Sequence, residues 1–131
     1  MSYEKVSDIP AKPKETVVRL DTGDLVAVSC DREHSGGTMR FFAHARAINE
    51  DGETIANAMG GQLKASLSYA VDMPVVESEG ADIIARDCLL AVIGEPVDRQ
   101  GWSAQWLASA SIRSHLVAAQ SVGSVNAGDL L

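Results

Sequence analysis

The stretch from Thr38 to Ile48 constrains the fold more than any other, because its apolar and polar side chains alternate. Side chains of a β-strand point alternately to its two faces. We therefore predict a central antiparallel strand whose alanine-rich face lies under a helix. That face carries Met39, Phe41, Ala43, Ala45 and Ala47, and the mostly charged face carries Arg40, Phe42, His44, Arg46 and Ile48.

Short apolar or alternating runs predict further strands on both sides of this one. Asp51-Gly52 favours a tight hairpin turn, and the polar residues from Asp31 to Gly37 are expected to form a loop. The pattern changes after Pro74, where the apolar residues take up helical spacing. The predicted strands are Thr16–Leu20, Leu25–Cys30, Thr54–Ala56 and Leu63–Val71.

Two helices are predicted in the last third of the chain. Ser78 is a candidate N-cap for a helix that ends at Gly94, and Ser103 can cap a second helix from Ala104 to about Val122. Strands followed by helices indicate an α+β fold. We expect an antiparallel sheet of about four or five strands, packed by two C-terminal helices.

We expect one α+β domain over residues 16–122, with a segment of different character at each end. Pro10 and Pro13 favour an extended N-terminal arm over residues 1–15, and residues 123–131 are expected to form a C-terminal tail. Each end either packs on its own domain or reaches neighbouring subunits, and the pattern does not decide between them. If the two ends reach neighbouring subunits, we expect Tyr3, Ile9 and Leu130 to bind a partner.

The charge of the chain limits its partners. The 131 residues carry a formal net charge of −7, whereas a surface that binds nucleic acid needs an excess of basic groups. No stretch reaches the roughly 20 apolar residues of a membrane span, and the first residues lack the apolar run of a signal peptide. We expect a protein made in the cytosol that binds neither nucleic acid nor membrane.

The sequence offers no catalytic, cofactor or metal signature. Cys30 and Cys88 lie in apolar segments, which suits buried thiols better than reactive ones. Cys30 and His34, with His44, fall short of the four spaced ligands of structural zinc. We therefore expect no catalytic residue, no cofactor and no metal ion.

Basic side chains gather on the polar face of the central strand, in a chain that is otherwise acidic. Arg40, His44 and Arg46 share this face, and Lys64 is expected nearby. One interpretation is a solvated face balanced by acidic neighbours. The other is a docking face for an acidic patch of a copy or partner, for example one like the Glu50-Asp51 hairpin tip.

The hairpin-forming run from Asp21 to Ile55 resembles small structural proteins of tailed-bacteriophage virions. The resemblance implies a non-enzymatic subunit of a head, neck, tail or baseplate, assembled in the host cytoplasm and located in the virion. Its partners would be copies of itself or other virion proteins. Two alternatives stay open: a small acidic binding or inhibitor module acting on a host protein, and a small enzyme with an unfamiliar site that includes His44 and Arg40.

Overall fold

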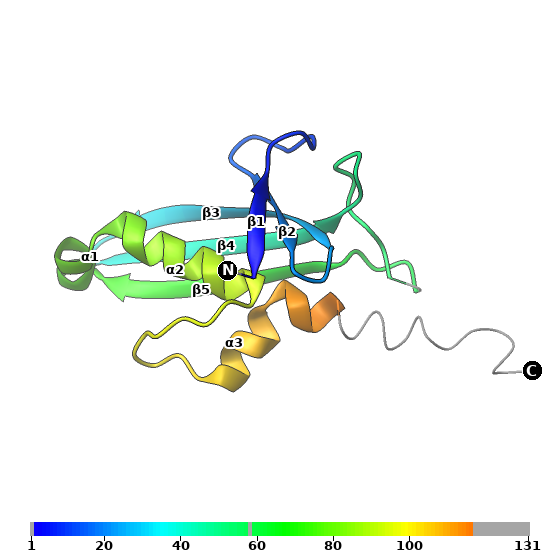
Figure 1. Cartoon of the computed structure of the whole chain (residues 1–131). Coiled ribbons are helices and arrows are strands. Elements are labelled where there is room, and N and C mark those ends of the chain that lie inside the picture. The colour runs from blue at the N-terminus through cyan, green and yellow to red at the C-terminus, as the bar shows by residue number, and fades with distance from the viewer. Residues whose placement is uncertain (1, 58, 117–131) are drawn as a thin grey trace, which may run out of the picture.

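A computed structural model describes residues 2–57 and 59–116 as a five-stranded antiparallel sheet with helices packed on one face (Figure 1). The strands lie side by side in chain order. This architecture confirms the predicted α+β class. The strands are β1 Tyr3–Val6, β2 Thr16–Leu20, β3 Leu25–Ser35, β4 Thr38–Ile48 and β5 Lys64–Asp72, and the helices are α1 Met73–Glu79, α2 Ala81–Ile93 and α3 Ala104–Ala110.

The central strand is β4, with the predicted division of its faces. Phe41, Ala43, Ala45 and Ala47 are buried in the main core. The helix over them is α2, which packs across β3, β4 and β5, while α3 packs beside it against β5. The small alanine side chains let α2 approach the sheet closely.

A second, smaller core lies on the opposite face of the sheet. It joins Val17, Leu25, Ala27 and Ile48, and Val6 and Ile9 pack against it from the N-terminal residues. β3 is therefore buried on both faces at this end, which explains its continuous apolar run.

The N-terminal residues lie on their own domain. β1 pairs antiparallel with β2, with Tyr3 opposite Leu20 and Val6 opposite Val17. Tyr3 packs against the main core and Ile9 against the smaller one. Leu130 and the predicted tail lie outside the described residues.

The predicted loop from Asp31 to Gly37 is wrong. β3 continues to Ser35, which pairs with Thr38, so only Gly36 and Gly37 form the turn. The residues from Asp31 to Ser35 are exposed. Their strand is held by backbone pairing with β4, a contribution that side-chain polarity does not reveal.

Two predicted segments differ from expectation, and the predicted end of the second, near Val122, lies outside the described residues. Thr54 and Ala56 form isolated bridges to Ile48 and Gln62 in place of a strand. The helix from Ala104 breaks at Ser111, whose backbone is extended. The Ser111 hydroxyl accepts a hydrogen bond from the Ser114 backbone N–H at 3.4 Å, and helical structure resumes at residues 112–116. A side chain read as helix interior is thus a cap for the next turn.

A helix also begins earlier than predicted. α1 starts at Met73 with Pro74 in its first turn, and Ser78 lies inside it. Proline suits this position because its missing N–H has no partner in the first turn of a helix. Gly80 then separates α1 from α2.

Candidate functional site

The outer edge of β5 is the feature around which the candidate site is built. Two surface cavities lie along it. Lys64, Ala65 and Ser66 line one, of about 530 Å³, and residues 69–72 line the other, of about 570 Å³. We call them the basic cavity and the acidic cavity, after the charges described below.

The basic cavity lies at the start of β5, where the polar face of the sheet comes near the helical residues 112–116. His44 and Ser66 are cross-strand neighbours there, as are Arg46 and Lys64. His115 also lines the cavity, from the helical residues 112–116. The structure thus brings His44 and Arg46 together with Lys64, as the sequence predicted.

Arg46 is not available to a partner, because it is buried and paired. Its Nε donates to Glu15 Oε2 and its second terminal nitrogen to Oε1, both at 2.8 Å. The remaining nitrogen donates to the Gly52 carbonyl and the Thr54 hydroxyl. The two side chains are only 9% and 12% exposed. Since Glu15 neutralises Arg46, the net positive charge of the basic cavity comes from Lys64.

Arg40 lies apart from this cavity. It is exposed near the other end of β4, opposite Glu33 on β3, and it donates to the Ser68 hydroxyl at 3.3 Å. The predicted polar face is therefore divided. Arg40 lies beside an acid on the surface, Arg46 is inside an ion pair, and His44 and Lys64 are exposed.

The acidic cavity lies at the end of β5, between that strand, α1, α2 and the residues after α2. Four carboxylates line it, and Val75 and Ile83 add exposed apolar surface. Arg99 is the one basic residue in its lining. The carboxylates belong to Asp72, Glu79, Asp87 and Asp98.

Arg99 holds the acidic cavity together. Its guanidinium pairs with Glu79 at 3.1 Å and with Asp87 at 2.5 Å, and the side chain is only 8% exposed. It also lies over the rings of Tyr69 and Trp102, 5.7 and 5.8 Å from their centroids. These ion pairs raise the pKa of Arg99 against the opposing effect of burial, so it stays charged.

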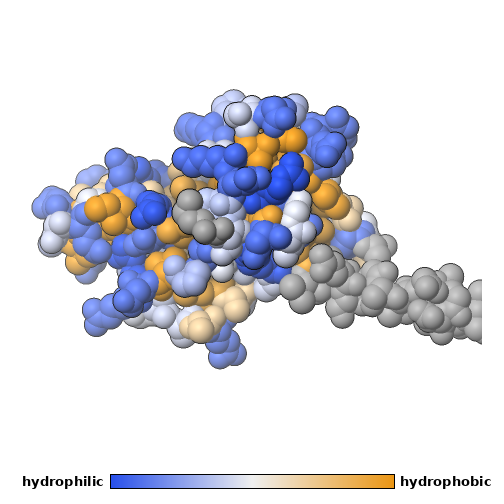
Figure 2. Space-filling model, in the orientation of Figure 1, coloured by the Kyte–Doolittle hydropathy of each residue, from blue (hydrophilic) through white to orange (hydrophobic). Residues whose placement is uncertain are grey.

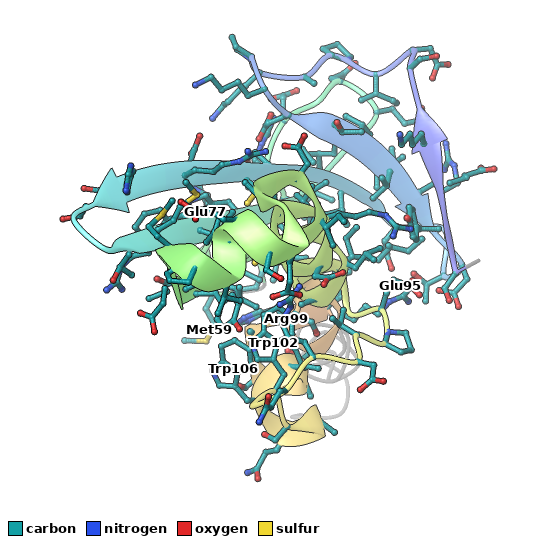
Figure 3. The ribbon with its side chains drawn as sticks, turned by 90° about the vertical axis from the view of Figure 1, so that its left-hand side faces the viewer. Met59, Glu77, Glu95, Arg99, Trp102 and Trp106 are labelled. Atoms are coloured by element: carbon teal, nitrogen blue, oxygen red, sulfur yellow. The ribbon has the colours of Figure 1, made fainter. Side chains whose placement is uncertain are left out.

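An aromatic group continues from Arg99 toward α3. Trp102 meets Tyr69 edge-on at 5.0 Å and Trp106 at 5.3 Å, measured between ring centroids. Figure 3 shows Arg99, Trp102 and Trp106 gathered on one side of the molecule. These contacts attach the residues after α2 to the helical side of β5.

The backbone of β5 has one free side. The Ala47 N–H donates to the Leu63 carbonyl and the Met73 N–H to the Gly37 carbonyl, and residues that exchange such bonds alternate along an antiparallel pair. The backbone groups of Ala65, Leu67, Tyr69 and Val71 therefore point to β4. Those of Ser66, Ser68 and Ala70 point outward, where β5 pairs with no strand of the described chain.

The two cysteines are unsuited to nucleophilic chemistry. Burial raises the pKa of Cys88 to about 12 and also raises that of Cys30. Both thiols are therefore protonated at neutral pH. Within residues 2–57 and 59–116, no three His, Cys, Asp or Glu side chains gather into a metal-binding group. No described helix is long and apolar enough to cross a membrane.

Comparison with protein-family models, curated proteins and solved structures finds no match for this chain.

Sequence reasoning missed the acidic end of the site. Asp72 and Arg99 attracted no prediction, because neither belongs to a motif. One signal was present: between Lys64 and Asp72 the strand contains no charged residue. An edge strand of nine residues with no charge between its ends lacks a protection that natural edge strands commonly carry.

Proposed function

We propose that the protein is a non-enzymatic assembly subunit that docks to its neighbours by adding a strand at the outer edge of β5. One observation carries this proposal: β5 is a nine-residue edge strand with charges only at its two ends. Its free N–H and C=O groups form a template for another strand.

The other edge strand of the sheet, β1, differs from β5 in its length and in its charges. β1 has only four residues, and Glu4 and Lys5 stand exposed in its middle. Short, charged edge strands discourage pairing with other chains. α3 packs on the helical face of β5 and does not pair with the backbone of its outer edge. In Figure 1, β5 is accordingly the outermost of the three long strands.

The setting proposed for this subunit is a tailed-bacteriophage particle, with copies of itself or other virion proteins as partners. The resemblance of residues 21–55 to virion hairpins suggests that setting, and an assembly role agrees with the open strand edge. In this proposal His44 and Lys64 serve docking at the start of β5.

A proline substitution tests docking without disturbing the fold. The Ser68 N–H points away from β4, so Ser68→Pro removes an outward donor while keeping the bonds between β4 and β5. Ser68→Ala is the matched control, because it removes the same hydroxyl, and its bond from Arg40, but keeps the N–H. Light scattering after size-exclusion chromatography should show associated wild-type and Ser68→Ala protein and monomeric Ser68→Pro.

The same variants should differ in particles. Mass spectrometry of purified virions should detect the wild type and Ser68→Ala but little Ser68→Pro. A folded Ser68→Pro variant that associates and enters particles as well as the control would reject the proposal. A similar melting temperature for the two variants shows that folding is not the cause.

The acidic cavity favours a second candidate, a module that binds a basic segment of a host protein. Its carboxylates surround exposed Val75 and Ile83, a combination suited to a lysine- or arginine-containing apolar segment. A single host protein bound in a fixed ratio by monomeric protein, and lost with Asp98→Lys, would favour this candidate.

A further inference from the structure

We infer that the strand added to β5 is the β5 strand of a second copy, paired antiparallel about a two-fold axis through Ser68. This inference rests on the proposed strand addition and specifies its partner. It follows from the charges at the ends of β5, the direction of its free backbone groups and the faces of its side chains.

The charges of β5 are self-complementary. Lys64 begins the strand and Asp72 ends it. When two copies pair antiparallel over the full strand, Lys64 of each lies opposite Asp72 of the other. This register gives two opposite-charge pairs, one at each end of the joined edge, and opposite charges placed across a ladder stabilise it.

The backbone groups fit the same register. Pairing centred on Ser68 places Ser66 of one copy opposite Ala70 of the other, and Ser68 opposite itself. These residues point their N–H and C=O groups outward, so each pair can exchange both hydrogen bonds. Centring on Ser68 is also the one two-fold arrangement that pairs all nine residues.

The side chains agree as well. In this register Leu67 lies opposite Tyr69 and Ala65 opposite Val71, all on the helical face of β5. An aromatic side chain beside a branched aliphatic one is a favourable cross-strand pair. The polar face carries Ser66, Ser68 and the charged pairs, so neither face places an apolar group opposite a charge.

The two-fold axis runs perpendicular to the sheet and keeps both helical layers on one side. That side carries exposed Val75, Ile83 and Trp106. Figure 2 shows that the hydrophobic surface on the face it displays forms separate patches among hydrophilic residues. A second copy brings its own layer next to these side chains, and Asp72 of that copy lies at the mouth of the basic cavity.

Charge reversal tests the partner and the register together. In Lys64→Asp the end pairs become Asp opposite Asp, and in Asp72→Lys they become Lys opposite Lys. The dimer of each variant should have a dissociation constant at least about ten-fold higher than that of the wild type. Analytical ultracentrifugation measures this constant. The double variant Lys64→Asp/Asp72→Lys should regain wild-type association, because both pairs become attractive again.

Mixing the two single variants gives a sharper test. A heterodimer of Lys64→Asp with Asp72→Lys has an opposite-charge pair at both ends, whereas each homodimer has like charges at both. The mixture should therefore form dimers that neither variant forms alone, seen by native mass spectrometry. Asp8→Lys is the matched control, because it makes the same charge change on an exposed residue between β1 and β2, at the other edge of the sheet.

The outcomes separate this inference from the proposed function. If Ser68→Pro abolishes association but charge reversal does not change it, the β5 edge binds another strand or register, and the inference fails alone. Wild-type protein that stays monomeric at all concentrations also rejects the inference. If the Ser68→Pro variant enters particles as well as the wild-type protein does, the proposed function fails too.

Discussion

The Arg46 guanidinium binds both carboxylate oxygens of Glu15 at 2.8 Å. This bidentate pair joins the central strand to the residue that precedes β2. Because Arg46 also donates to the Gly52 carbonyl and the Thr54 hydroxyl, it joins β4 both to the distant Glu15 and to the turn that follows β4. Bidentate pairs of this kind are among the stronger polar contacts in proteins.

Arg46→Ala should destabilise the protein by about 3 kcal/mol, because it leaves the largely buried Glu15 carboxylate without its charged partner. The measurement is the free energy of unfolding in urea. Arg40→Ala is the control on the same face of β4, and its exposed side chain predicts a change within about 0.5 kcal/mol. Equal losses for the two arginines would contradict the structural role of the pair.

Glu15 should make stability depend on pH in the acid range. The hydrogen bonds from Arg46 hold the pKa of Glu15 below its ordinary value of 4.5, although burial opposes them. The unfolded chain then binds the proton more readily than the folded one. The stabilisation is therefore complete above pH 4.5 and disappears as the pH falls through the lowered pKa.

The Glu15→Gln variant isolates this contribution from the other carboxylates. Its stability difference from the wild type should be constant at neutral pH and shrink steadily below pH 4.5, in urea titrations at a series of pH values. A difference that stays constant down to the acid transition would show that Glu15 titrates normally in the folded protein.

Arg99→Lys should loosen the residues after α2. Lysine keeps a charge but cannot bridge Glu79 and Asp87 while stacking on Tyr69 and Trp102. We expect a loss of about 1–2 kcal/mol and a red shift of tryptophan fluorescence, since both tryptophans of the chain lie in this cluster. Arg86→Lys, an exposed arginine on α2, should change neither quantity.

The two thiols should react at different rates. Cys88 is fully buried and has its pKa raised to about 12, while Cys30 is only partly buried. A thiol reagent near pH 8 should modify Cys30 first and reach Cys88 only when the protein opens. In Cys30→Ser the remaining reaction should accelerate with urea, as followed by mass spectrometry. Rapid modification of Cys88 in the native state would contradict its burial.

The elements of the fold that depend on side-chain periodicity could be predicted from the sequence. The alternation from Thr38 to Ile48 placed β4, its alanine face and the helix above it, because burial sorts side chains by face. It could not predict that β3 extends to Ser35, since the pairing of this segment with β4 is a backbone interaction. Ser111 was read as a helical residue because its capping role depends on the direction in which the chain turns.

Prediction of the candidate site was limited in the same way. The proximity of His44, Arg46 and Lys64 could be predicted, because it follows from the positions of these residues on two neighbouring strands. The neutralisation of Arg46 by Glu15 could not be predicted, because the position of Glu15 depends on how the N-terminal residues pack on the sheet. Asp72 and Arg99 line one cavity because α1 and α2 pack against β5, an arrangement that no local pattern encodes.

The chain-order arrangement of the strands has a consequence for synthesis. Every ladder joins strands that are consecutive along the polypeptide, so each hairpin can close as soon as its second strand leaves the ribosome, at small loop entropy. Among residues 2–57 and 59–116, β5 is the last strand to emerge, and α1 follows it directly. The unpaired outer edge of β5 is therefore exposed only late in synthesis, after the other four strands have paired.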